Sequence, residues 1–209
     1  MLLTTRKIFL KRPKTLGLHE NFIVGDANNR LPFENNFFNS IFSNIVYWLD
    51  DPSLTFKEIA RILKPKGRCC VMLPNNTFPE FSFYYSLYVI NQDKNFQFLD
   101  KLDRGRISDN IKHAKSGEEW LEIIEKAGLK VVSNKKHLSK TTIQIWDIGL
   151  RPLFPLLHKM VTSIDKEKVV EIKKEWIETF KVFLEPIHKL DSGLNQDIEP
   201  AFHCFILEK

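Results

Sequence analysis

Glycine is scarce and scattered in this sequence. The chain has 209 residues and eight glycines, and no two of them are close enough to form a G-x-G sequence. They are Gly17, Gly25, Gly67, Gly105, Gly117, Gly128, Gly149 and Gly193. A phosphate-binding turn needs glycines where the backbone approaches the phosphate closely. The glycine positions therefore count against a nucleotide-binding α/β enzyme that relies on such a turn.

Cysteine is also sparse, with only Cys69, Cys70 and Cys204. The sequence has no C-x-x-C pair and no His–Cys cluster at ligand spacing, so we expect no metal site. An odd, small number of cysteines is typical of a reducing compartment. The first residues do not resemble a signal peptide, and no run of about 18 apolar residues occurs. We therefore predict a cytoplasmic protein without a membrane span.

The remaining composition is ordinary for a globular protein with a core: 43% of the residues are hydrophobic and 27% are charged. The net charge is +5, and basic residues concentrate in the first twenty positions. Such a basic segment can contact nucleic acid or anionic lipid. No RNA-binding or helix-turn-helix pattern accompanies it. We interpret it as a solvated surface, with a short helix before Pro13, and expect no nucleic-acid partner.

Residues 22–73 alternate between strand and helix patterns. Short apolar runs at 22–24 and 39–45 predict two strands, and an apolar run at 68–73 predicts a third that is covered on both faces. Between them, Asp51 and Pro52 suit the start of a helix, as cap and first-turn residue. Its expected apolar face consists of Leu54, Ile59, Ile62 and Leu63. This alternation favours an α/β fold with a Rossmann-like, doubly wound sheet.

The second half of the chain predicts more helix than strand. A capped helix spans 116–127 and ends at Gly128, a strand follows at 129–133, and a last strand lies at 201–207. Helical patterns fill the stretch between these strands, and we expect the first of them, 146–162, to be broken by its prolines. The second, 166–190, presents an apolar face of Val169, Ile172, Trp176, Phe180 and Phe183.

Three parts follow from these patterns. We predict a cofactor domain at 1–134, a helical insertion or lid at 135–200, and the last strand of the sheet at 201–209. The insertion is too long for a simple connection between neighbouring strands. It precedes the last strand, where it covers a sheet edge or closes over a bound molecule.

Two motifs link the first of these parts to a known family. The segments L-P-F-E-N-N-F-F at 31–38 and E-I-A-R-I-L-K-P-K-G at 58–67 follow the Gly25–Asp26 turn in the order and spacing of that family. The chain resembles the class I S-adenosylmethionine-dependent methyltransferases, in particular those with a type 11 methyltransferase domain. The resemblance covers roughly residues 15–135. Asn39 replaces a common aspartate, and Lys66 stands where the family often has glycine.

The resemblance implies where the cofactor, S-adenosylmethionine, binds. It implies that Asp26 accepts a hydrogen bond from the adenine amino group and that Ala27 contacts the ring. It places Asn44 and Ile45 beside the ribose and the sulfonium. From the residues alone, Asp26 has a simpler interpretation, because aspartate after glycine often caps a turn.

The residues on the substrate side are weaker candidates. Tyr47, Trp48 and Asn75 lie just beyond the ends of two strands, and for Trp48 core packing is the competing interpretation. Methyl transfer from a sulfonium is an in-line displacement that needs alignment and the exclusion of water, whereas a general base is optional. We therefore assign no catalytic residue.

The family's first strand and its glycine loop have no counterpart here, so we expect an N-terminally truncated domain whose incomplete sheet lacks its first strands. The function that the resemblance implies is S-adenosylmethionine-dependent methyl transfer to a small-molecule acceptor, with activity doubtful in a truncated chain. The alternative is a non-catalytic binding or scaffold protein derived from a methyltransferase, with a partner chain that completes the sheet. A different doubly wound α/β enzyme is the third interpretation.

Overall fold

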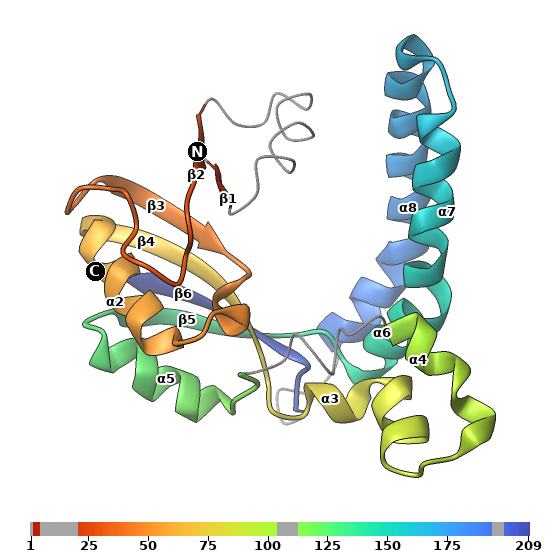
Figure 1. Cartoon of the computed structure of the whole chain (residues 1–209), viewed down its shortest axis with the longest axis horizontal. Coiled ribbons are helices and arrows are strands. Elements are labelled where there is room, and N and C mark those ends of the chain that lie inside the picture. Colours follow the sequence, from red (N-terminus) through yellow and green to blue (C-terminus); the bar gives the residue numbers. More distant parts are fainter. Residues whose placement is uncertain (1, 5–20, 104–112, 194–198) are drawn as a thin grey trace. The chain divides into compact units, whose positions relative to one another are not determined.

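The structure is a computed structural model that describes residues 2–4, 21–103, 113–193 and 199–209 (Figure 1). The chain forms two compact units. We call them the sheet unit, which comprises 1–73, 115–135 and 204–209, and the helical unit, which comprises 74–114 and 136–203. Residues 74–114 thus group with the predicted insertion.

The sheet unit contains a four-stranded sheet in the order β3-β4-β6-β5 and a separate two-stranded parallel sheet of β1 and β2. Its elements are β1 (Leu2–Thr4), β2 (Phe22–Val24), β3 (Phe38–Ser43), the 3₁₀ helix η2 (Val46–Trp48), α2 (Pro52–Ile62), β4 (Leu63–Pro74), α5 (Gly117–Lys126), β5 (Lys130–His137) and β6 (Phe202–Glu208). All the strands predicted from the sequence are confirmed. The prediction of a short helix before Pro13 is wrong for residues 2–4, which form strand β1. The other residues of that predicted helix lie outside the described ranges.

Strand direction sets which loops share an edge of the sheet. β3 runs parallel to β4, with Ile41 opposite Cys69. β6 runs antiparallel to β4, because the backbone of Lys209 bonds that of Gly67 while the Cys70 and Cys204 sulfurs lie 3.8 Å apart. The carboxyl ends of β3 and β4 therefore lie at one edge, where ligands bind in open α/β sheets.

Helix α2 begins as the sequence predicts. The Asp51 carboxylate accepts hydrogen bonds from the backbone N–H of Ser53 at 2.7 Å and of Leu54 at 3.2 Å. The predicted apolar face is wrong at one position, because Leu54 is 54% exposed and Phe56 is fully buried instead. The helix thus presents Phe56, Ile59 and Ala60 to the sheet, with the spacing of one helical face, and Leu63 joins the same core at the start of β4.

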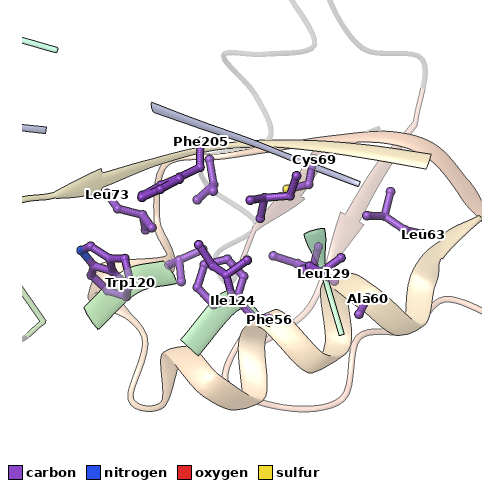
Figure 2. Packing of buried hydrophobic residues seen from close by; sticks show 13 residues of the cluster. Phe56, Ala60, Leu63, Cys69, Leu73, Trp120, Ile124, Leu129 and Phe205 are labelled. Carbon is purple, nitrogen blue, oxygen red and sulfur yellow. The ribbon is translucent and has the colours of Figure 1, made fainter. Parts of the chain in front are cut away.

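The core of the sheet unit lies between the sheet and the two helices α2 and α5 (Figure 2). Alternate residues of β4 point into it, namely Cys69, Val71 and Leu73, and α5 contributes Trp120 and Ile124. Burial raises the pKa of the Cys69 thiol to about 12, which marks it as a packing residue and not a nucleophile.

Helix α5 carries both capping signals that its sequence predicts. The Ser116 hydroxyl accepts from the Glu119 N–H at 3.2 Å, and the Glu119 carboxylate accepts from the Ser116 N–H at 2.7 Å. This reciprocal pair is a capping box. Gly128, with a φ of 82°, follows the helix in the left-handed region, as expected for a C-terminal cap.

The K-P-K-G segment forms an irregular turn at the start of β4. Between the pairs Phe38–Leu63 and Ser40–Arg68, β4 has more residues than β3, so the register shifts. Lys66 has a φ of 63°, a left-handed conformation that glycine adopts more easily. This conformation gives a physical reason for the glycine that the family often has there.

Gly67 is expected to tolerate no side chain. A methyl group there would lie 2.8 Å from the Lys64 carbonyl oxygen and 3.2 Å from that of Asn39. We expect Gly67→Ala to lower the free energy of unfolding by about 2 kcal/mol, the cost of overpacking. Urea denaturation measures it. Gly149→Ala is the matched control, since nothing lies within 4 Å of the added carbon. Equal stability of the two variants would contradict the expectation.

The helical unit consists of short segments followed by a long hairpin. It contains α3 (Phe78–Phe81), a π-helical turn η3 (Tyr84–Val89), the 3₁₀ helix η4 (Lys94–Phe96), α4 (Phe98–Asp103), α6 (Lys140–Ile145), a second π-helical turn η5 (Trp146–Leu150), α7 (Arg151–Thr162) and α8 (Lys166–Gly193). The predicted break at the prolines is wrong for Pro155, because α7 continues through it. No helix in the described residues is long and apolar enough to span a membrane.

Candidate functional site

The turn after β2 fixes the carboxylate of Asp26. One oxygen accepts from the Asn28 N–H at 3.0 Å, and the other accepts from the Asn29 side-chain amide at 3.1 Å. Asp26 thus caps the turn that follows β2, which is the simpler of the two interpretations from the sequence. A carboxylate has about four lone-pair directions, and Asp26 is exposed. The bonds therefore orient the group and leave it able to accept a further donor.

A single hydrogen bond ties this turn to the segment after β3. The side-chain oxygen of Asn28 accepts from the backbone N–H of Asp50 at 2.8 Å. Asp50 lies two residues after η2 and directly precedes Asp51, the cap of α2. Two loops that are 22 residues apart in the chain are joined at this point, so the turn containing Asp26 and the end of the loop after β3 lie side by side.

The loop after β3 presents the other two predicted cofactor residues to solvent. Asn44 is exposed and Ile45 is 38% exposed, while Ala27 in the neighbouring turn is half-buried. The Ile45 carbonyl accepts from the Trp48 N–H at 2.9 Å, which closes η2. Asn44 and Ile45 therefore lie at the carboxyl end of β3 with surface left for a ligand.

Tyr47 and Trp48 have different surroundings. Tyr47 is half-buried and packs against the core, whereas Trp48 is 49% exposed. Their rings meet edge to face, with centroids 5.5 Å apart. Core packing therefore does not account for Trp48, and its exposed surface lies next to the cofactor candidates in the chain.

Asn75 is fully buried in the helical unit. Its side-chain amide donates to the Thr77 hydroxyl at 2.9 Å and to the Glu199 carboxylate at 2.8 Å. Its side-chain oxygen has no hydrogen-bond partner in the described part of the chain. These bonds hold the end of β4 against the segment before β6, and a substrate role for Asn75 stays a prediction.

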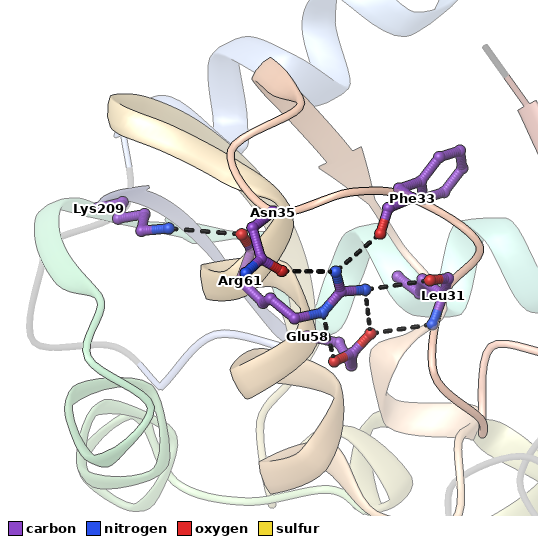
Figure 3. Close-up of polar contacts among 6 residues, drawn as sticks. All are labelled: Leu31, Phe33, Asn35, Glu58, Arg61 and Lys209. Atoms are coloured by element: carbon purple, nitrogen blue, oxygen red, sulfur yellow. Dashed lines mark hydrogen bonds and ion pairs between the residues drawn. The ribbon is translucent and has the colours of Figure 1, made fainter.

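Sequence reasoning missed the polar cluster around Arg61 (Figure 3). Its guanidinium group uses all five N–H donors. They bind both oxygens of Glu58, the Leu31 and Phe33 carbonyls, and the Asn35 side chain, at 2.7–3.0 Å. The L-P-F motif is thus held through its backbone. The only sequence signal is the Glu58–Arg61 spacing of three, typical of a helical ion pair.

Glu58 closes the same cluster from the other side. Besides binding Arg61, its carboxylate accepts from the Leu31 N–H at 2.9 Å. The hydrogen bond from Arg61 lowers the pKa of Glu58, so the carboxylate stays ionised at neutral pH. Because Leu31 follows the Asp26 turn closely, this cluster anchors the loop that carries the cofactor candidates to α2.

The described residues contain no group of three histidine, cysteine or acidic side chains that could hold a metal ion. The turn after β2 and the loop after β3 present an oriented carboxylate and an exposed aromatic ring. A carboxylate accepts hydrogen bonds, and an aromatic face attracts cations.

Two comparisons of the sequence with known proteins find methyltransferases. The sequence model of a family described as "Methyltransferase domain" matches residues 4–71. The ubiquinone/menaquinone biosynthesis C-methyltransferase UbiE of Desulfotalea psychrophila is 29% identical over 131 residues, which is 60% of this chain and 52% of the relative. The chain thus spans about half the length of the curated relative that it matches.

Solved structures share the fold. A candidate sarcosine dimethylglycine methyltransferase from Galdieria sulphuraria superposes with a TM-score of 0.53 at 16% identity, covering 99% of this chain and 68% of the other. An S-adenosylmethionine-dependent methyltransferase from Mesorhizobium loti superposes with a TM-score of 0.52 at 11% identity, covering 100% of this chain and 79% of the other. The predicted Rossmann-like α/β fold is confirmed. Residues 4–71 thus match a methyltransferase domain, in agreement with the resemblance to class I S-adenosylmethionine-dependent methyltransferases that the sequence shows.

Proposed function

We propose that this chain binds S-adenosylmethionine beyond the carboxyl ends of β2 and β3 and takes part in methyl transfer to a small-molecule acceptor. The hydrogen bond between Asn28 and Asp50 carries the proposal, because it joins the two loops that hold the predicted cofactor residues. The match of residues 4–71 to a methyltransferase domain supports the choice of cofactor. The position of Asn44 and Ile45 supports it too, since they follow the carboxyl end of β3, where open α/β sheets bind ligands.

The residues at this site fit the cofactor. Asp26 is exposed and held in one orientation by Asn28 and Asn29, so its carboxylate can accept from an adenine amino group. Ala27 follows it and is placed to border the adenine ring. Asn44 and Ile45, at the end of β3, are the proposed neighbours of the ribose and the sulfonium.

The bound cofactor supplies an activated methyl group, and the chain's own task is to align the acceptor and exclude water. We assign Tyr47 and Trp48 to the acceptor side. An exposed indole face next to a sulfonium would gain roughly 0.5–2 kcal/mol of cation–π attraction. No residue is assigned as a general base, because this displacement does not require one when the acceptor is already nucleophilic.

The same proposal includes a further strand beside β3. In the described residues β3 has a hydrogen-bonded neighbour only in β4, and its Phe42 side chain is 66% exposed. An unpaired strand edge favours strand addition, and the apolar side chain favours a covering element. A partner chain, as in the alternative interpretation of the sequence, would pair here.

Calorimetric titration of S-adenosylmethionine tests the cofactor site. We expect Asp26→Ala to raise the dissociation constant roughly 10- to 100-fold, the effect of losing a hydrogen bond to a charged group. Asp93→Ala is the matched control. Asp93 caps an equivalent exposed turn, with its oxygen 2.9 Å from the Asn95 N–H, but lies in the helical unit. The Asp93→Ala variant should bind S-adenosylmethionine with the same dissociation constant as the unmodified chain. Equal losses in both variants, or no binding by the folded chain, would refute the site.

A further inference from the structure

The two faces of the four-stranded sheet carry different cysteines. Cys69 of β4 packs in the core, whereas the next residue, Cys70, is half-buried on the opposite face. On β6, Phe205 packs in the core and Cys204 beside it is half-buried, so Cys204 shares the face of Cys70. Both thiols are free, and their sulfur atoms lie 3.8 Å apart. The fold thus separates two cysteines that are adjacent in the sequence and brings together two that are 134 residues apart.

Two backbone hydrogen bonds fix the register of β4 against β6. The Lys209 N–H donates to the Gly67 carbonyl at 3.1 Å, and the Asn75 N–H donates to the Ala201 carbonyl at 2.8 Å. In an antiparallel pair, one strand ascends in number as the other descends, and both bonds fit the same register. No residue is therefore inserted in either strand between these two points.

This register adds a third sulfur atom to the face. Met72 lies directly opposite Cys204, in a pair without hydrogen bonds between the two residues, where side chains approach most closely. Met72 also follows Cys70 by two residues, so both side chains stand on the same face of β4. Like the two cysteines, Met72 is half-buried. Two thiols and one thioether thus meet on the side of the sheet opposite the core.

The geometry of the two thiols favours a bridging ion over a disulfide. In this register Cys70 and Cys204 are diagonal neighbours. Diagonal residues lie about 7–8 Å apart, whereas a disulfide requires Cα atoms within about 7 Å, so the strands would have to shift. Two thiolates that bind one ion at about 2.3 Å in tetrahedral geometry lie about 3.8 Å apart. The observed sulfur separation of 3.8 Å is therefore already that of two ligands of one ion.

The type and number of ligands select the ion. Thiolate and thioether sulfur atoms are soft ligands, and the ion that accepts both is Cu(I). Structural zinc takes four ligands from cysteine, histidine and carboxylate side chains. Among the described residues, no third side chain of these types joins Cys70 and Cys204. Calcium and magnesium require oxygen ligands, which this face of the two strands does not offer at the sulfur atoms.

We infer that Cys70, Cys204 and Met72 form a binding site for Cu(I) on the face of the sheet opposite the core. Burial raises the pKa of the Cys70 thiol, so this group carries its proton when no ion is bound. Each thiol that coordinates the ion releases its proton to solvent, and neither copper nor sulfur changes oxidation state. The bound ion links β4 to β6 where the chain leaves the sheet unit and returns to it.

Anaerobic titration of Cu(I) into the reduced full chain, in competition with the chromophoric chelator bathocuproine disulfonate, tests the site. We expect one Cu(I) per chain. Cys70→Ser and Cys204→Ser should each raise the dissociation constant for Cu(I) at least about 100-fold, because each removes a ligand. Met72→Leu should raise it less, since a neutral thioether binds more weakly than a thiolate. Cu(I) should also raise the melting temperature of the unmodified chain but not that of the serine variants.

Cys69→Ala and Met160→Leu are the matched controls. Cys69 packs in the core on the other face, and Met160 is 54% exposed in the helical unit. Both variants should bind Cu(I) with the dissociation constant of the unmodified chain, and far-UV circular dichroism monitors the folding of every variant. A folded chain that takes no Cu(I) from equimolar chelator would overturn the inference. Equal losses of affinity in Cys69→Ala and Cys70→Ser would overturn it too.

Discussion

Replacing Arg61 by alanine is expected to lower the free energy of unfolding by about 3 kcal/mol, the cost of removing one partner from a largely buried ion pair. The side chain is only 17% exposed and makes five hydrogen bonds. Its loss leaves the Leu31 and Phe33 carbonyls and the Glu58 carboxylate without these donors. Urea denaturation measures the change. Because the anchored loop follows the Asp26 turn, cofactor affinity should fall as well.

The pH dependence separates this ion pair from simple packing. The folded-state pKa of Glu58 lies below its ordinary value of 4.5, chiefly through the hydrogen bond from Arg61. A carboxyl group with a lowered pKa stabilises the fold above its unfolded-state pKa and loses that contribution as the pH falls through the folded-state pKa. The difference between the unmodified chain and Arg61→Ala should therefore shrink as the pH is lowered below about 4.5.

Arg68→Ala provides the control for removing an arginine from the same unit. Arg68 meets Glu208 at 3.4 Å, but its side chain is 63% exposed. Exposed ion pairs contribute about 0–1 kcal/mol, so this variant should remain close to the unmodified chain. If Arg61→Ala is no more destabilising than Arg68→Ala, the cluster does not hold the loop and its assigned role is wrong.

The second large effect is expected in the core. Trp120→Ala should lower the free energy of unfolding by about 4 kcal/mol, as for other large-to-small core substitutions. Trp120 is fully buried on α5 and belongs to the cluster that joins α5 to α2 and the sheet. Its removal opens a cavity where these elements meet. Chemical denaturation followed by far-UV circular dichroism gives the change.

Trp48→Ala is the matched control for the loss of a tryptophan. Trp48 is 49% exposed and lies outside the core cluster, so we expect a loss below about 1 kcal/mol. Trp120→Phe should keep much of the packing, so its loss of free energy of unfolding should lie between those of Trp48→Ala and Trp120→Ala. Similar destabilisation by Trp48→Ala and Trp120→Ala would mean that the core does not lie where the structure places it.

Local signals in the sequence predict most of the sheet unit. The Asp51 cap, the Ser116–Glu119 capping box and the Gly128 end depend on residues within a few positions of one another, and all three are confirmed. The face of α2 was harder to predict. Leu54 and Phe56 are both apolar, and only the position of the sheet decides which of them is buried.

The contacts that join the loops of the candidate site were not predictable. Asp26 and Asn44 each follow an apolar strand, but β2 and β3 lie in separate sheets, so a shared sheet edge does not bring the two residues together. Arg61 bonds carbonyls 28 and 30 residues away, and Asn28 bonds Asp50 across 22 residues. No periodicity or spacing predicts such contacts, because they depend on how the loop folds back onto α2.

A crystal structure of the chain grown with S-adenosylhomocysteine, the demethylated cofactor, tests the central claim most directly. The account predicts the adenine amino group within hydrogen-bond distance of the Asp26 carboxylate, with the ribose beside Asn44 and Ile45. Cofactor bound elsewhere on the chain, or crystals of the folded chain without cofactor at saturating concentration, would contradict it.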